Sequence, residues 1–189
     1  DDKNAVKGEL FVTAELKDFL ILTRDQGMDP TDLMGSYAGA MGYGQFMPSS
    51  YRGYAVDFDQ DGKIDIWNNP VDAIGSVANY FKQHGWRTGE AVVAAADASA
   101  NTPDAIFVKA KADLKPQRTV AQFAADGVVA RQKLDPQAMA TAMKFELEDG
   151  YEYWLGLHNF YVITQYNHSA MYAMSVYQLS QRIAARVAQ

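Results

Sequence analysis

The chain of 189 residues is 48% hydrophobic and 21% charged, which is typical of a soluble globular protein and unlike a disordered chain. A formal net charge of -6 at pH 7 and the lack of a basic stripe argue against nonspecific binding to nucleic acid, which relies on clustered lysine and arginine. Because cysteine is absent, the chain can form no disulfide, thiolate metal site or thiol nucleophile.

The sequence predicts a first helix over Leu10–Arg24, where apolar residues recur at helical spacing and Gly27 follows as a stop. The longest apolar run, Phe19–Leu22, is much too short to span a bilayer. Asp29-Pro30-Thr31-Asp32 then supplies a capping residue followed by proline, so we predict a short second helix there.

The clearest helix prediction starts at Asn69-Pro70, which repeats this start pattern, and runs until Gly85. Its apolar stripe, which we expect to be the buried face, consists of Ile74, Val77, Ala78 and Phe81. Tyr80 lies away from that stripe. The position of Tyr80 therefore favours a role in a binding groove over a role in the core.

Beyond Trp86 the hydrophobic period changes from helical to alternating. Residues 108–112 alternate apolar side chains with Lys109 and Lys111, as a half-buried strand requires. Residues 143–148 alternate in the same way, and Asp149-Gly150 supplies a two-residue turn before Tyr151–Trp154, which predicts a β-hairpin.

Two further elements complete the prediction. We expect a strand over Phe160–Thr164 that adds to the sheet. The apolar residues of the last segment recur at helical spacing and predict a C-terminal helix that returns to the first core: Tyr172, Val176, Leu179, Ile183 and Val187. The fold class is therefore α+β, with a helical core over residues 1–95, a small antiparallel β unit over 96–165, and a closing helix over 166–189.

An acidic loop begins at Asp57. Asp57, Asp59 and Asp61 at alternate positions, followed by Gly62, match positions 1, 3, 5 and 6 of an EF-hand calcium loop, and the carbonyl of Lys63 would be a further ligand. Position 12, usually a bidentate glutamate, is instead Asn68. We expect Asp72, in the first turn of the next helix, to close a longer loop. The predicted ion is a structural Ca²⁺, with Na⁺ as the alternative ion and a solvated acidic turn as the alternative interpretation.

Glycine, aromatic and amide side chains alternate along residues 36–50. A phosphate-binding loop is disfavoured because no Lys-Ser/Thr pair follows Gly44. Glycines permit a ligand to approach the backbone closely, and Gln45 with the neighbouring tyrosines could bond to and stack on sugars. Tight helix packing would use small residues as well.

Taken together, the segment 36–50, the Asp57 loop, Pro70–Phe81 and Tyr151–Tyr172 closely resemble the lytic murein transglycosylase B family. The resemblance implies a lysozyme-like fold and non-hydrolytic cleavage of the β-1,4 bond between N-acetylmuramic acid and N-acetylglucosamine, which gives a 1,6-anhydro end. It also implies a monomer in the Gram-negative periplasm that binds peptidoglycan strands, needs no organic cofactor and could contact cell-wall synthesis proteins. An N-terminal lipid absent from this chain could anchor the parent protein to the outer membrane.

The resemblance also assigns a set of residues to the glycan groove: Ser36, Tyr37, Gln45, Tyr80, Tyr166, Asn167 and Tyr172. Tyr172 lies on the apolar stripe of the last helix, so a core role is its alternative. His84 and His168 are interpreted as structural, because no metal-ligand or triad spacing surrounds them.

In the family, one catalytic glutamate sits in a Glu-Thr motif upstream of the glycine-rich segment, and this chain has no such motif. Glu9 and Glu15 are interpreted as solvent-facing acids of the first helix, with either one as the alternative catalyst. We therefore expect a portion of a transglycosylase that starts downstream of the catalytic helix and is inactive alone. The alternative is a non-catalytic module that binds peptidoglycan or a cell-wall partner.

Overall fold

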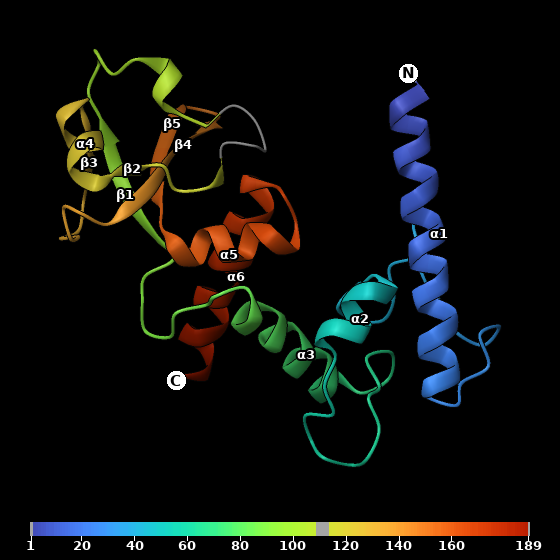
Figure 1. Cartoon of the computed structure of the whole chain (residues 1–189). Coiled ribbons are helices and arrows are strands. Elements are labelled where there is room, and N and C mark those ends of the chain that lie inside the picture. The colour runs from blue at the N-terminus through green and yellow to red at the C-terminus, as the bar shows by residue number, and fades with distance from the viewer. Residues whose placement is uncertain (1, 109–113, 189) are drawn as a thin grey trace. The chain divides into compact units, whose positions relative to one another are not determined.

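The computed structural model describes residues 2–108 and 114–188, and it confirms the α+β fold class (Figure 1). The chain divides into two compact units, one ending at Gln83 and the other beginning at His84. The three-part division predicted from the sequence stays a prediction. Among the described residues, no helix combines the length and the apolarity that crossing a membrane requires.

The first unit consists of three helices, α1 (Asp2–Asp25), α2 (Pro48–Tyr54) and α3 (Pro70–Gln83), joined by two long loops. The predicted first helix is confirmed and begins earlier than expected. Its apolar residues are mostly exposed: Leu10, Phe11, Val12, Leu16 and Leu20. The buried core of this unit includes Leu22 from α1 and Tyr51 from α2, together with Met41, Phe46 and Ile66 from the loops.

The short helix predicted after Asp29 is wrong, because residues 30–32 form a turn. The Asp29 carboxylate accepts hydrogen bonds from the backbone N–H of Thr31 (2.8 Å) and from its hydroxyl (2.6 Å). These bonds lower the pKa of Asp29 from its usual value. A side chain that accepts hydrogen bonds from the neighbouring backbone in this way competes with helix formation.

Helix α3 is confirmed, but its predicted buried face is wrong. Ile74 is 70% exposed, whereas Asp72, Ala73, Ser76 and Tyr80 are buried. The polar residues are buried because they form hydrogen bonds with the backbone of the preceding loop. The Ser76 hydroxyl accepts one from the Val56 N–H (3.0 Å). A buried polar group is tolerated where it has such a partner.

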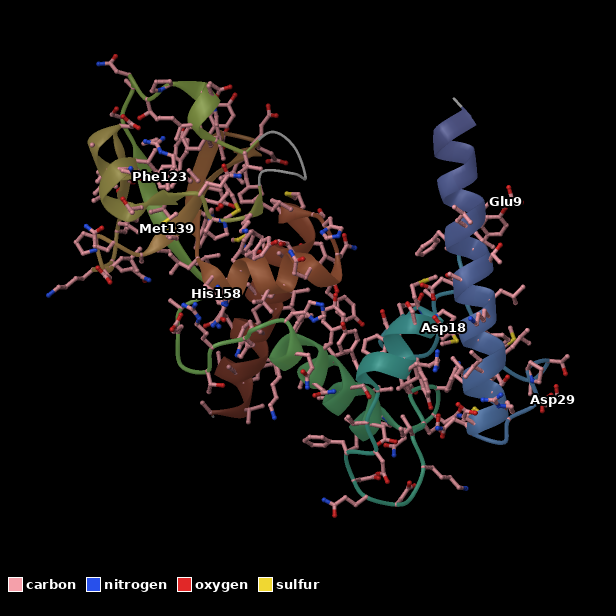
Figure 2. The ribbon with its side chains drawn as sticks, in the orientation of Figure 1. Glu9, Asp18, Asp29, Phe123, Met139 and His158 are labelled. Atoms are coloured by element: carbon pink, nitrogen blue, oxygen red, sulfur yellow. The ribbon has the colours of Figure 1, made fainter. Side chains whose placement is uncertain are left out.

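The second unit contains a five-stranded antiparallel sheet in the order β2-β4-β5-β1-β3. The strands are β1 (Val93–Ala98), β2 (Arg118–Thr119), β3 (Val128–Ala130), β4 (Met139–Leu147) and β5 (Gly150–Gly156). Its helical elements are a 3₁₀ turn (Asp104–Ile106), α4 (Val120–Ala125), α5 (His158–Tyr166) and α6 (Ala170–Val187). Phe123 of α4 belongs to the core of this sheet (Figure 2).

The predicted hairpin is confirmed as β4–β5, with its turn one residue earlier than expected. Leu147 pairs with Gly150, so the two turn residues are Glu148 and Asp149. Gly150, at φ 124°, takes a backbone conformation that residues with a Cβ rarely adopt, at the start of β5. The predicted strand over 108–112 falls largely on residues 109–113, outside the described residues.

The strand predicted over Phe160–Thr164 is wrong, because these residues belong to helix α5. Phe160, Val162, Ile163 and Thr164 are all buried, so this short helix is covered on most sides, and a run of that kind cannot be told from a buried strand by periodicity. The Asn159 amide bonds to the backbone of Arg87 and Glu90, which fixes the start of the helix. The C-terminal helix is confirmed as α6, and its return to the first core stays a prediction.

Candidate functional site

Three carboxylates of the first unit converge. Each of three residues contributes one carboxylate oxygen, and these three oxygens lie within 4.8 Å of one another: Asp57, Asp59 and Asp72. Asp57 and Asp59 come from the acidic loop (residues 57–69), and Asp72 comes from the first turn of α3. Three negative charges this close repel one another, and a hard cation prefers several oxygen ligands. The residues therefore fit a divalent cation such as Ca²⁺.

The acidic loop is held closed by its own carboxylates. Asp57 accepts hydrogen bonds from the N–H groups of Asp61 (3.1 Å) and Gly62 (2.9 Å), and Asp61 accepts one from Lys63 (2.9 Å). Gln60, at φ 64°, and Gly62, at φ 93°, make the tight turn. Asp61 and Lys63 lie outside the cluster of three, and their ligand roles stay predictions.

Asp72 is the buried anchor of the acidic loop, with no exposed surface. Its carboxylate accepts hydrogen bonds from the N–H groups of Phe58 (2.8 Å), at the start of the loop, and Asp65 (2.9 Å), beyond its middle. Asn68, at EF-hand position 12, bonds instead to Asp65. The sequence analysis missed the role of Asp65, whose carboxylate accepts hydrogen bonds from the N–H groups of Trp67 and Asn68 in the turn over residues 66–68, although an aspartate at the start of a turn often bonds to the backbone in this way.

A second loop, the signature loop (residues 35–46), is closed by main-chain bonds. Met41 and Phe46 exchange two N–H to carbonyl hydrogen bonds (2.8 and 3.0 Å), and both side chains are buried. Gln45 has φ 53°, which is uncommon for a residue other than glycine, and its amide nitrogen donates to the Gly42 carbonyl (2.9 Å). Ser36, Tyr37 and Gln45 are all exposed.

The two loops meet at Ile66. The Tyr43 N–H donates to the Ile66 carbonyl (2.9 Å). A Cβ at Gly42, where φ is 64°, would come within 2.5 Å of the same oxygen. The Trp67 indole N–H donates to the Met34 carbonyl (3.2 Å), just before the signature loop. The acidic loop and the signature loop therefore share a rigid junction.

A cavity of about 680 Å³ lies between α1 and the signature loop. One wall is helical and mostly apolar, with Phe11, Leu16 and the carboxylate-bearing Glu15. The other wall includes Ser36 and Tyr37. Glu15 is not simply solvent-facing as predicted, because it is half-buried and its carboxylate accepts two hydrogen bonds from Ser49. Local sequence pattern could not reveal a contact across 34 positions.

The remaining predicted groove residues have different surroundings. Tyr80 is buried, with its ring edge-on to Tyr54 (4.8 Å between centroids), and burial raises its pKa. The expectation that Tyr80 lies away from the buried face of α3 is therefore wrong, and its groove role stays a prediction. In the second unit, Tyr166 ends α5, Asn167 is its exposed C-cap, and Tyr172 lies in the first turn of α6, where burial raises its pKa.

Comparison with known proteins gives a consistent result. A family profile described as "Transglycosylase SLT domain" matches residues 5–181. The membrane-bound lytic murein transglycosylase B of Escherichia coli (strain K12) is 50% identical over 179 residues, which are 94% of this chain and 47% of the relative. The chain thus spans about half the length of that curated relative.

Two solved structures of relatives that are longer than this chain have the same fold. The soluble lytic transglycosylase SltB1 from Pseudomonas aeruginosa matches with a TM-score of 0.86 and 52% identity, over 93% of this chain and 57% of that one. The Escherichia coli lytic transglycosylase Slt35 in complex with calcium matches with a TM-score of 0.83 and 49% identity, over 93% of this chain and 54% of that one.

Proposed function

Because the chain belongs to the transglycosylase SLT domain family, we propose that the complete protein is a lytic transglycosylase of peptidoglycan and that this chain holds the glycan strand. The family resemblance and the lysozyme-like fold expected from the sequence are confirmed. The proposed reaction breaks the bond between N-acetylmuramic acid and N-acetylglucosamine as the muramic 6-hydroxyl attacks, without water. It is a carbon–oxygen lyase reaction that leaves a 1,6-anhydro end.

The observation that carries this proposal is the signature loop, which presents Ser36, Tyr37 and Gln45 at the surface. Gln45 keeps a left-handed backbone conformation that costs on the order of 1 kcal/mol or more, and such strain is found mostly where a site requires it. With its amide nitrogen bonded to Gly42, Gln45 would offer a sugar its amide oxygen as acceptor. An exposed tyrosine supplies a face on which a sugar ring can stack.

We propose that the family's catalytic glutamate is absent from this chain, so that the chain alone binds strands without cutting them. A specific contact favours this second function, a non-catalytic binding module: both carboxylate oxygens of Glu15 are occupied by Ser49. A general acid must instead reach a proton acceptor on the substrate. Glu9 lies on the exposed surface of α1.

The test is digestion of purified peptidoglycan sacculi by the chain, with mass spectrometry of anhydromuropeptides and co-sedimentation of the protein. Co-sedimentation without anhydro products is the expected result. Anhydro products would show that a catalyst is present, and Glu9→Gln and Glu15→Gln would then identify it. A chain that neither binds nor cuts sacculi would overturn the proposed function.

We propose that Asp57, Asp59 and Asp72 hold Ca²⁺, with Asp61 and the Lys63 carbonyl as further ligands and Na⁺ as the competing ion. The cluster of carboxylates supports a cation, and the calcium complex of Slt35 supports this choice of ion. The ion would supply positive charge that offsets the repulsion among the carboxylates and stabilises the loop. No organic cofactor is part of the proposal.

We propose that the complete protein acts as a monomer in the Gram-negative periplasm, with a lipid anchor in the outer membrane, and that cell-wall synthesis proteins are its partners. Peptidoglycan as substrate and the membrane-bound description of the Escherichia coli relative support this location. Fractionation of cells that express the complete protein tests it. Recovery in the cytoplasm would contradict the proposal.

A further inference from the structure

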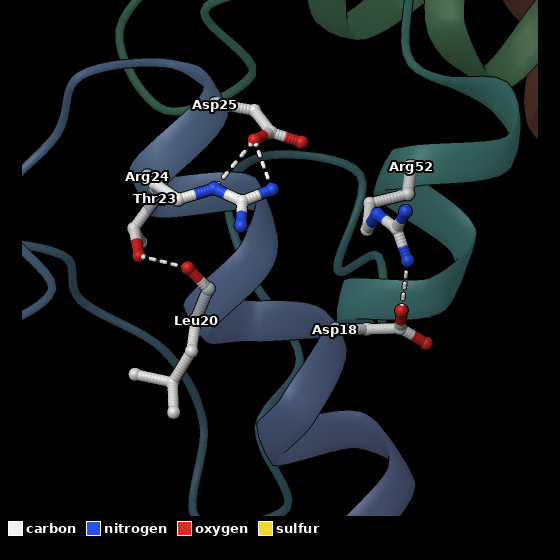
Figure 3. Close-up of polar contacts among 6 residues, drawn as sticks. All are labelled: Asp18, Leu20, Thr23, Arg24, Asp25 and Arg52. Atoms are coloured by element: carbon white, nitrogen blue, oxygen red, sulfur yellow. Dashed lines mark hydrogen bonds and ion pairs between the residues drawn. The ribbon is translucent and has the colours of Figure 1, made fainter.

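Helices α1 and α2 are joined by two polar contacts at matching intervals. The Glu15 carboxylate accepts hydrogen bonds from the Ser49 N–H (2.9 Å) and from the Ser49 hydroxyl (2.7 Å). One turn further along both helices, Asp18 forms an ion pair with Arg52 (Figure 3). Residues three apart lie on the same face of a helix, so the two contacts fix the register of α1 against α2.

Ser49 also lies close to the signature loop in the sequence. Ser49 is the second residue of α2, and only Met47 and Pro48 separate it from the end of that loop. Pro48 and Tyr51 are buried, so this turn of helix is packed against the rest of the unit. A displacement of Ser49 would therefore move the adjoining loop that carries Ser36 and Gln45.

Two of the contacts that α1 makes with α2 are polar, whereas much of the apolar surface of α1 is exposed. Leu16 and Leu20 are 56% and 52% exposed. Apolar contacts are non-directional, whereas hydrogen bonds to a carboxylate have defined geometry and are roughly twice as strong as neutral ones. Glu15 is therefore suited to setting a position.

We propose that Glu15 is a positioning residue: through Ser49 it holds the signature loop in the arrangement that binds a glycan strand. The inference rests on the proposed function, because it takes Ser36 and Gln45 as contacts of the glycan. Glu15 touches no reacting atom in this role. It lines the same cavity as Ser36 and Tyr37.

The test compares Glu15→Gln, Ser49→Ala, Ser49→Thr and the double variant Glu15→Gln/Ser49→Ala with the unmodified chain. Affinity for chitotetraose is measured by calorimetry well below the unfolding midpoint. Glutamine keeps one acceptor and places an N–H₂ against a donor, so we expect Glu15→Gln to bind about threefold to tenfold more weakly. Ser49→Thr retains both donors and should bind normally. Glu9→Gln, an exposed acid of the same helix (Figure 2), is the matched control.

A purely structural role would lower the unfolding temperature of Glu15→Gln and leave the affinity of the folded protein unchanged, and that result would overturn the inference. Coupling is the second readout: the double variant should bind no more weakly than Glu15→Gln alone, whereas additive losses would contradict a shared contact. If Glu15→Gln fails to fold, equal affinities of Ser49→Ala and Ser49→Thr would overturn the inference and a loss only in Ser49→Ala would support it. If the unmodified chain binds neither chitotetraose nor sacculi, the proposed function fails and the inference fails with it.

Discussion

The signature loop and the acidic loop meet at Ile66 but are closed by different forces. In the signature loop, neutral main-chain bonds between the buried residues Met41 and Phe46 close the turn. In the acidic loop, carboxylates accept the backbone N–H groups, and three of them converge. The first loop should therefore keep its shape over a wide range of conditions, whereas the second should depend on a cation and on its acids remaining ionised.

The largest effect should come from breaking the junction between the two loops. In Gly42→Ala, the new Cβ meets the Ile66 carbonyl at 2.5 Å in a backbone conformation that already disfavours alanine, so we expect a loss of about 3 kcal/mol or more. Unfolding in denaturant measures this loss of unfolding free energy. Gly53→Ala in α2 is the control, because nothing lies within 4 Å of its added Cβ and a helix gains from alanine. Equal stabilities of the two variants would contradict a rigid junction.

Removing the anchor of the acidic loop should have the next largest effect. Asp72→Ala leaves the N–H groups of Phe58 and Asp65 without their acceptor, and we expect a loss of about 2–4 kcal/mol, again from denaturant unfolding. Asp72→Asn keeps one acceptor and removes one of the repelling charges. The new N–H₂ faces one of the two buried N–H donors, so we expect a loss of about 1–3 kcal/mol in a chelator. The loss should be larger in calcium, and a loss that is the same with and without calcium would contradict a cation at this position.

Calcium itself distinguishes the two loops. At a concentration about 100 times its dissociation constant, Ca²⁺ should stabilise the chain by about 2.7 kcal/mol, seen as a higher unfolding temperature than in chelator. Asp57→Asn should reduce this gain, while Gln45→Gly in the signature loop should keep it. Magnesium and sodium are the comparison ions, and a gain from sodium equal to that from calcium would favour Na⁺ as the resident ion.

A smaller effect compares the two glutamines with positive φ, Gln45 at 53° and Gln60 at 64°. Replacing either with glycine relieves the strained backbone, so stability should change by no more than about 1 kcal/mol in either direction. Affinity for chitotetraose should fall only in Gln45→Gly, because only this residue belongs to the proposed glycan site. Calorimetry checks the pair, and equal affinities would remove Gln45 from the site.

The smallest effect concerns alkaline stability. Burial, together with the charges of Asp65 and Asp72, raises the pKa of Tyr51 to about 12 from its usual value of 10. The unfolded state loses this proton first, so the contribution of Tyr51 to stability should be constant below pH 10 and fall as pH rises from 10 to 12. Tyr51→Phe removes the titrating hydroxyl, which donates to the Ile64 carbonyl, and its unfolding free energy should fall less steeply in that range.

Regular local patterns in the sequence predicted much of this molecule correctly. Strict alternation around Met143 predicted the β4–β5 hairpin, and the spacing from Asp57 to Gly62 predicted the acidic loop in which Asp57 and Asp59 converge with Asp72. In both cases one short segment contains the whole pattern, because the side-chain period or the ligand spacing is set by the local backbone.

The errors arose where a distant partner decides burial. Asp72 and Ser76 turn the buried face of α3 away from Ile74 because they bond to amides 14 and 20 positions earlier. Residues 158–166 form a helix where a strand was expected, because a short run that is buried on most sides shows no period that distinguishes the two. The contact between Glu15 and Ser49 spans 34 positions, and neither residue carries a local sign of it.

Trp67 has a consequence for spectroscopy. Its ring lies 5.5 Å from that of Tyr51, and its indole N–H is hydrogen-bonded beside the signature loop, while its backbone N–H is bonded to Asp65 in the acidic loop. The fluorescence emission of an indole depends on nearby aromatic rings and on the hydrogen bond of its N–H group. With Trp86 and Trp154 replaced by phenylalanine, Trp67 would become a single fluorophore at the junction, and ion and sugar titrations could be followed in one cuvette by the same emission band.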